Sequence, residues 1–141
     1  MVAFTNVLAA AGLITTALAK DWSALCREYP PSKGECVIIS HYSQRQLNAG
    51  DRKIMRLSGE CEVREDADWV PQSPGFKYEF DIGGIGHVVA RTSSVGGDAV
   101  ARPSVTVNGK TPPSFDRGQK SFSEGITVTW YRQLNYKCLD L

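Results

Sequence analysis

Apolar and polar residues alternate with a period of two along most of the chain. In residues 53–64, Met55, Leu57 and Val63 alternate with charged or polar side chains. The same alternation runs through residues 76–82 and through residues 126–138, where Arg132 is the one charged side chain on the apolar face. Because successive side chains of a strand point to opposite faces, this period predicts half-buried β-strands.

Turn signals separate the predicted strands. The glycines of residues 83–86 predict a hairpin between residues 76–82 and 87–91, and Asn108-Gly109 favours a type I′ turn after residues 105–107. The best candidate helix, residues 21–27, is short, and residues 98–103 and 111–125 are expected to form surface loops. The pattern predicts an all-β fold, a small antiparallel sandwich or barrel of about six to eight strands.

The first nineteen residues are predominantly apolar, carry no charged side chain and end in Ala17-Leu18-Ala19. A small residue at each end of such a triplet is the pattern that signal peptidase cleaves, and the apolar stretch is too short to span a membrane. We therefore expect a secreted, extracellular protein that begins at Lys20. Residues 20–141 then have the length of a single domain.

The four cysteines are expected to form two disulfides, because the number is even and the predicted compartment oxidises thiols. Three pairings are allowed. Residues 43–52 carry turn formers around Asn48 and Ala49, and a fold-back about that point places Cys36 opposite Cys61. This favours Cys36 with Cys61 and Cys26 with Cys138. No C-x-x-C pair is present, so the cysteines do not predict a metal site.

Charge and motifs exclude several classes of partner. Sixteen basic residues against fifteen acidic ones leave no net field to attract nucleic acid or an anionic membrane. We expect no nucleic-acid binding, no membrane insertion, no cofactor and no identified catalytic site. A small ribonuclease is the enzymatic alternative, with His41 and His87 for proton transfer, Glu60 or Glu62 as a carboxylate and Arg91 for the phosphate.

Two aromatic residues are candidate contacts for a binding partner. Trp69 lies between an acidic run and Pro71, which favours exposure, and Tyr131 lies on the polar face of the last predicted strand. Trp130 shares the apolar face and is expected in the core. Exposed aromatic side chains would also suit a carbohydrate-binding or cell-wall-associated protein, which is the second alternative.

The leader ending in A-x-A, a cysteine soon after it, a β-rich body and a last cysteine near the end resemble the small secreted effectors and toxins of plant-pathogenic fungi. The favoured pairing, first cysteine with fourth and second with third, is similar to that of the ToxB-like (MAX-type) group. Residues 105–110 resemble a strand and turn of that group. The resemblance implies a two-sheet β-sandwich and a non-catalytic virulence role, in which an effector or elicitor binds a host or surface protein or provokes host defence. It transfers no functional residue.

Overall fold

The computed structural model describes residues 20–46, 50–96 and 99–141. The predicted leader, residues 1–19, and the predicted turn residues Asn48 and Ala49 lie outside the described residues. In chain order the described elements are α2 (Lys20–Glu28), β1 (Glu35–Arg45), β2 (Asp51–Leu57), β3 (Val63–Asp68), β4 (Val70–Gln72), β5 (Gly75–Ile82), β6 (Gly86–Thr92), β7 (Val95–Gly96), β8 (Ala99–Val100), β9 (Ser104–Val107), β10 (Ser114–Glu124) and β11 (Thr127–Lys137).

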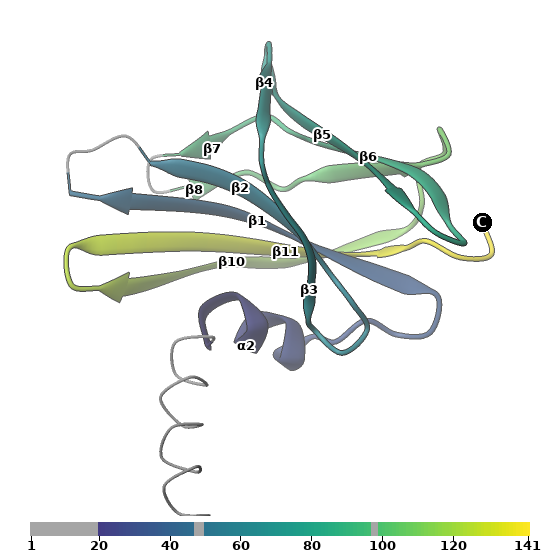
Figure 1. Ribbon diagram of the computed structural model, residues 1–141, viewed down its shortest axis with the longest axis horizontal. Coiled ribbons are helices and arrows are strands. Elements are labelled where there is room, and N and C mark those ends of the chain that lie inside the picture. The colour runs from purple at the N-terminus through teal and green to yellow at the C-terminus, as the bar shows by residue number, and fades with distance from the viewer. Residues whose placement is uncertain (1–19, 47–49, 97–98) are drawn as a thin grey trace, which may run out of the picture.

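The strands form two main antiparallel sheets. Sheet A has the order β10-β11-β1-β2-β3, sheet B has the order β4-β5-β6-β9, and β7 pairs with β8 in a short ribbon. Figure 1 shows the sheets as two layers, with α2 against the side of sheet A that faces away from sheet B. The all-β prediction is confirmed. The described chain has more strands than the six to eight expected because β4, β7 and β8 are only two or three residues long.

The predicted hairpins form where the turn residues allow them. β5 and β6 pair antiparallel through the glycine-rich turn, in which Gly84 and Gly86 have φ of +80° and +123°. After β9, Asn108 and Gly109 have φ of +50° and +79°, as a type I′ turn requires. The side chain of Asn108 joins the two turns, because its Oδ1 accepts the His87 amide and its Nδ2 donates to the Ile85 carbonyl.

The main core lies between the two sheets. Alternate residues of each strand point inward, as the period-two pattern predicted. The inward-facing set from sheet A is Ile38, Tyr42, Ile54, Leu134 and Tyr136, and the set from sheet B is Phe80, Val88, Ala90, Val105 and Val107. These side chains are all at least nine-tenths buried, so contact between the sheets is the main apolar burial of the fold.

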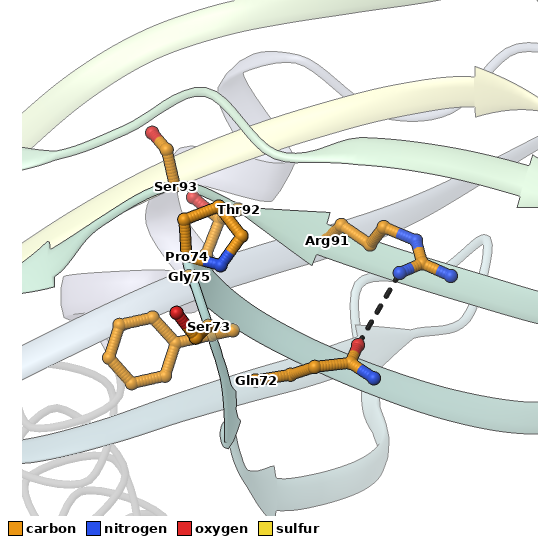
Figure 2. A pocket seen from close by; sticks show the side chains of 8 residues that line it. Gln72, Ser73, Pro74, Gly75, Arg91, Thr92 and Ser93 are labelled. Atoms are coloured by element: carbon orange, nitrogen blue, oxygen red, sulfur yellow. Dashed lines mark hydrogen bonds between the residues drawn. The ribbon is translucent and has the colours of Figure 1, made fainter.

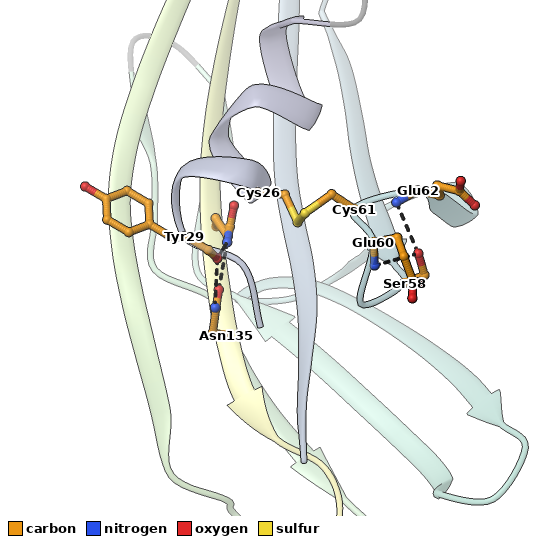
Figure 3. The surroundings of a disulfide bond; sticks show 8 residues. Cys26, Tyr29, Ser58, Glu60, Cys61, Glu62 and Asn135 are labelled. Carbon is orange, nitrogen blue, oxygen red and sulfur yellow. Dashed lines mark hydrogen bonds between the residues drawn. A yellow bond between two sulfur atoms is a disulfide. The ribbon is translucent and has the colours of Figure 1, made fainter. Parts of the chain in front are cut away.

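The opposite face of sheet A packs against α2, the predicted short helix. Its second core contains Leu25, Val37, Ile39, Met55, Leu57 and Tyr131. Beyond the end of α2, the buried amides of Gln133 and Asn135 both donate to the carbonyl oxygen of Tyr29, at 2.8 and 3.1 Å. Figure 3 shows the Asn135 amide directed at Tyr29. These bonds satisfy a carbonyl that would otherwise be left without a partner.

The predicted disulfide pairing is wrong. The structure joins Cys26 to Cys61 and Cys36 to Cys138. The predicted strand 53–64 is interrupted: β2 ends at Leu57, and Cys61 follows in a turn with φ of +63° and its amide bonded to the Ser58 carbonyl. Leu57 lies opposite Val37, whereas the predicted fold-back would have placed it opposite Ser40. This three-residue difference in register brings Ser58, not Cys61, to the level of Cys36. Cys61 bonds to α2 instead (Figure 3).

The expectation of a long loop at residues 111–125 is also wrong, because most of this segment is strand β10. β10 is an edge strand of sheet A, and both of its faces are partly exposed. Its polar residues therefore do not alternate with apolar ones, and the period-two signal is lost. The expected loop at residues 98–103 contains the short β8.

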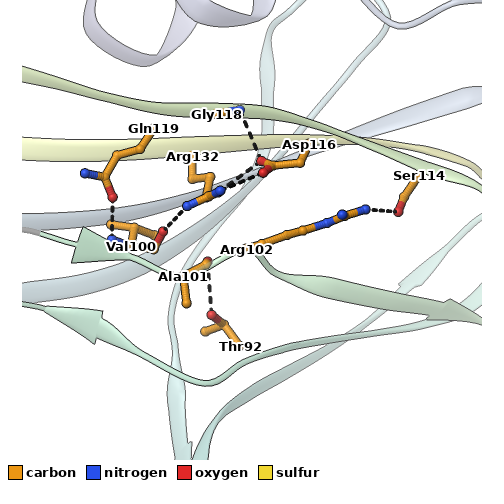
Figure 4. Close-up of polar contacts among 9 residues, drawn as sticks. All are labelled: Thr92, Val100, Ala101, Arg102, Ser114, Asp116, Gly118, Gln119 and Arg132. Atoms are coloured by element: carbon orange, nitrogen blue, oxygen red, sulfur yellow. Dashed lines mark hydrogen bonds and ion pairs between the residues drawn. The ribbon is translucent and has the colours of Figure 1, made fainter.

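Arg132, the charged residue on the apolar face of the last strand, holds β8 against sheet A. Its guanidinium donates to both carboxylate oxygens of Asp116, at 3.0 and 2.6 Å, and to the Val100 carbonyl at 3.0 Å. The Gln119 side chain accepts the Val100 amide, so both backbone groups of Val100 are bonded to sheet A (Figure 4). This charged side chain is therefore accommodated between the layers by a fixed set of partners.

Candidate binding surface

Trp69, expected at the surface, is buried. Only 3% of its surface is exposed, and its indole Nε1 donates to the hydroxyl of Ser40 at 3.0 Å. The chain crosses from sheet A to sheet B at this residue, between β3 and β4. The crossover turns the side chain into the main core, where the ring packs among apolar residues of both sheets. The expected exposure is wrong, and Trp69 is not available to a partner.

Tyr131 is buried as well, beneath α2. Its ring is 2% exposed, stacks on His41 with 5.0 Å between centroids, and meets the edge of Phe122 at 5.5 Å. The face of the last strand that appeared polar in the sequence is covered by the helix. The remaining tryptophans, Trp22 and Trp130, pack against the two cores, so no tryptophan forms an exposed platform for sugars.

The two histidines do not meet. His41 stacks on Tyr131 and so lies on the α2 side of sheet A. His87 alternates along β6 with the inward-facing Val88 and Ala90, which places it on the outer face of sheet B. Because packed sheets are about 10 Å apart and each histidine lies on the far side of its own sheet, their rings are separated by more than about 10 Å. The arrangement required for the ribonuclease alternative is absent.

The candidate acids of that alternative lie in a third place. Glu60 and Glu62 are exposed in and just after the turn that carries Cys61, and their amides donate to the Ser58 hydroxyl (Figure 3). This turn is bonded to α2 by the disulfide. The structure therefore does not bring either glutamate to His87, which is on the outer face of sheet B.

His87 instead belongs to an exposed group of charges. Its Nδ1 lies 2.8 Å from Asp81 Oδ1 and its Nε2 lies 3.2 Å from Glu79 Oε1, so a protonated ring donates to both carboxylates. Hydrogen bonds, first with Asp81 and then with Glu79, raise the pKa of His87 above its ordinary value. The bond with His87 lowers the pKa of Glu79, which also pairs with Lys77 at 3.5 Å.

These charges lie on a face that no described element covers. On the two central strands of sheet B the outward-facing residues are Lys77, Glu79 and Asp81 from β5 and His87, Val89 and Arg91 from β6. Val70 of β4 and Thr106 of β9 lie on the same face, opposite Lys77 and Val89. In the described part of the chain, the core that contains α2 is built with residues of sheet A. The two sheets therefore differ: the outer face of sheet A is part of a core, whereas the outer face of sheet B carries both signs of charge toward solvent.

A pocket of about 360 Å³ lies at one end of this face, where the β4–β5 turn meets the end of β6. Its lining is Gln72, Ser73, Pro74, Gly75, Phe76, Arg91, Thr92 and Ser93 (Figure 2). A side chain at position 75 would clash with the Thr92 carbonyl, since a Cβ there would lie 2.2 Å from that oxygen. Glycine thus allows the turn to pack directly on β6.

Arg91 is the charged group of the pocket. Its Nη1 donates to Gln72 Oε1 over a long 3.4 Å, and no carboxylate of the described residues lies within 4.0 Å of it. The guanidinium therefore retains donors for a ligand. The sequence predicts Arg91 as the phosphate-binding residue of the ribonuclease alternative. It does not indicate the pocket, because the pocket is formed by residues about twenty positions apart that meet only after β5 and β6 pair.

The described residues contain no cluster of three or more histidine, cysteine or acidic side chains placed to bind a metal ion. Within the same residues, no helix has the length and apolar character needed to cross a membrane.

Comparison with models of protein families, with curated proteins and with solved structures found no match to this chain. Its fold, its disulfides and the exposed face of sheet B are therefore the basis for inferring its function.

Proposed function

We propose that this protein is an exported, non-catalytic effector or elicitor that binds a host protein through the outer face of sheet B. The observation that carries the proposal is the uncovered, charged face itself, with Arg91 and the pocket at its end. Protein contacts commonly use an arginine beside a pocket as an anchor. The face offers both cations and carboxylates, which suits a protein surface better than a uniformly charged polymer.

Two further observations support this function over the enzymatic alternative. The candidate catalytic groups are divided between the α2 side of sheet A, the Cys61 turn and the outer face of sheet B. The two disulfides are typical of a protein stabilised for an oxidising compartment. The ToxB-like disulfide pairing is not formed, so the proposal does not rest on that pairing.

The proposal is tested with the purified chain comprising residues 20–141 and two charge reversals. Arg91→Glu alters the anchor on sheet B, and Arg45→Glu is the matched control at an exposed site at the end of β1 in sheet A. Leaf tissue is infiltrated with each protein and the defence response is titrated. We expect Arg91→Glu to require at least about tenfold more protein for the same response, as loss of a hot-spot arginine predicts. Arg45→Glu should match the wild type.

Equal potency of the two variants would contradict the use of this face. An RNA-cleavage assay on the same preparations distinguishes the enzymatic alternative, because cleavage that disappears in folded His87→Ala would establish catalysis. Export is tested separately by intact mass. The proposal expects the secreted chain to begin at Lys20, and retention of residues 1–19 would refute cleavage of a leader.

A further inference from the structure

A second surface, on the opposite side of the molecule from the outer face of sheet B, combines a free strand edge with an unpaired cation. β10 is the terminal strand of sheet A, and among the described strands it pairs only with β11. It is eleven residues long, and no other strand of the described residues pairs with its outer edge; the Gly118 amide is bonded to the Asp116 carboxylate. A long exposed edge of this kind is a template for an added strand.

Aromatic side chains lie next to this edge, on the face of sheet A that also carries α2. Phe115 is half exposed, with 51% of its surface accessible. The Arg117 guanidinium carbon lies 5.3 Å from the centre of the Tyr29 ring, just after α2, and 5.5 Å from the centre of Phe115. The pairing of β10 with β11 shifts between Asp116 and Gln119, a bulge of the kind that redirects side chains. Arg117 is thus held between the helix end and the strand edge.

Arg117 differs from the neighbouring cations in having no acidic partner. Arg132 is paired with Asp116, and Lys120 is paired with Glu28 at 2.5 Å. Among the described residues no carboxylate lies within 4.0 Å of Arg117, and its Nε is buried without a hydrogen-bond partner. The charge of this guanidinium is thus not neutralised by any acid of the described residues, and a carboxylate from another chain would pair with its terminal nitrogens.

We propose that β10 and Tyr29 form a docking edge for an extended acidic segment of a protein partner, which adds a strand to sheet A and places a carboxylate on Arg117. The unpaired backbone of β10 requires a peptide, because a polysaccharide or nucleic acid has no matching series of amides and carbonyls. The Arg117 guanidinium selects a carboxylate on the added strand. The rings of Phe115 and Tyr29 accommodate an apolar side chain two positions from that carboxylate on the added strand, where it points to the same face. This edge is independent of the sheet B face, and either surface can fail without the other.

The test uses a fluorescent peptide of alternating glutamate and valine as the probe, with the purified chain of residues 20–141. A second peptide of the same sequence carries N-methyl groups along one backbone edge, and a third has lysine in place of glutamate. Anisotropy titrations give the dissociation constants. Arg117→Gln removes the cation, Phe115→Ser removes the exposed ring, and Arg64→Gln is the matched control on β3, the opposite edge of sheet A.

We expect the glutamate peptide to bind at least about tenfold more tightly to wild type than to Arg117→Gln, since a charge-assisted hydrogen bond has roughly that effect on affinity. Arg64→Gln should bind like wild type, and the methylated and lysine peptides should not bind. Thermal melts identify any variant that fails to fold. If Arg117→Gln does not fold, the affinity of the glutamate peptide for Phe115→Ser, which should also be lower than for wild type, tests the same edge.

Three outcomes would overturn the inference. The first is no binding of the glutamate peptide, and the second is binding that persists in folded Arg117→Gln or after backbone methylation. The third is displacement of the peptide by polygalacturonate at equal carboxylate concentration, together with an equal loss of polygalacturonate binding in Arg117→Gln. That result would assign the site to an anionic polysaccharide. Loss of peptide binding together with an unchanged leaf response in Arg117→Gln would leave the sheet B proposal intact.

Discussion

The indole of Trp69 donates a hydrogen bond to the hydroxyl of Ser40, 29 positions away, and both side chains are buried between the sheets. Trp69 also donates its backbone amide to the carbonyl of Arg52 on β2. The crossover between the two sheets is therefore attached to β1 and β2 in the five-stranded sheet. This makes Trp69 part of the framework that positions sheet B.

Substitutions at this pair should reduce stability and leave the binding surfaces unchanged. Trp69→Phe keeps much of the packing but leaves the Ser40 hydroxyl buried without its donor, which should lower the free energy of unfolding by about 1–3 kcal/mol. Trp69→Ala also creates a cavity and should cost about 3–5 kcal/mol. Denaturant titration measures both. Lys33→Ala, an exposed control, should change stability by less than about 0.5 kcal/mol. If Trp69→Phe lost binding at either proposed surface while its free energy of unfolding was unchanged, the role of Trp69 in the framework would be contradicted.

The disulfide pairing can be read directly from peptides. Non-reducing digestion followed by mass spectrometry should give one linked peptide with Cys26 and Cys61 and another with Cys36 and Cys138. Detection of a Cys36–Cys61 peptide from the native protein would refute the observed pairing.

The two bridges should differ in their contribution to stability. On the chain-entropy model the bridge that closes 102 residues contributes roughly 4.7 kcal/mol, and the one that closes 35 residues roughly 3.8 kcal/mol. The double variant Cys36→Ser with Cys138→Ser should therefore unfold at lower denaturant concentration than Cys26→Ser with Cys61→Ser. The reverse order would indicate that packing of α2 on sheet A contributes more than loop closure.

The Asp116–Arg132 pair should give an acid-dependent contribution to stability. The hydrogen bonds from Arg132 lower the pKa of Asp116. A carboxyl whose pKa is lowered by folding stabilises the protein above its unfolded pKa of about 3.9, and the contribution is lost as pH falls through the folded value.

Asp116→Asn should accordingly reduce the free energy of unfolding by about 1–3 kcal/mol at neutral pH, because it removes a charge-assisted bond. The difference from wild type should shrink below about pH 4. Denaturant titrations at several pH values measure it, with Asp66→Asn on the exposed edge strand β3 as a control. If the free energies of unfolding of wild type and Asp116→Asn differed by the same amount at every pH, the Asp116–Arg132 ion pair would be excluded as the cause of the difference.

His87 should titrate above the usual histidine range. Asp81 and Glu79 raise its pKa, so NMR should place its midpoint above about 6.5, and Asp81→Asn should lower it. A raised folded pKa stabilises the protein below the unfolded value and the effect is lost as pH rises through the folded value. The melting temperature of wild type should therefore exceed that of His87→Gln at about pH 5.5 and match it at about pH 8.5. A midpoint at or below the ordinary value would contradict the observed contacts.

The candidate binding surface was only partly predictable. Arg91 was identified by its chemistry, since an arginine on a strand is a candidate for any anionic group. The pocket beside it could not be foreseen, because Gln72 and Thr92 approach one another only through the pairing of β4, β5 and β6. The polar neighbours of Trp69 predict exposure, whereas the crossover between the sheets turns its ring inward.

Local pattern by itself determined β5, β6, β9 and most of β11, the Asn108-Gly109 turn, the glycine hairpin and the short helix, because alternation and turn geometry depend on residues that are close in sequence. It did not indicate β10, whose edge position removes the alternation. Only the tertiary structure decided which cysteines pair, since the β1–β2 register differs by three residues from the predicted fold-back and Cys61 lies beyond the end of β2, next to α2. It also decided which outer face is covered. Packing of α2 on sheet A buries Tyr131 and leaves the charged residues of sheet B exposed, and this choice depends on contacts between segments far apart in the chain.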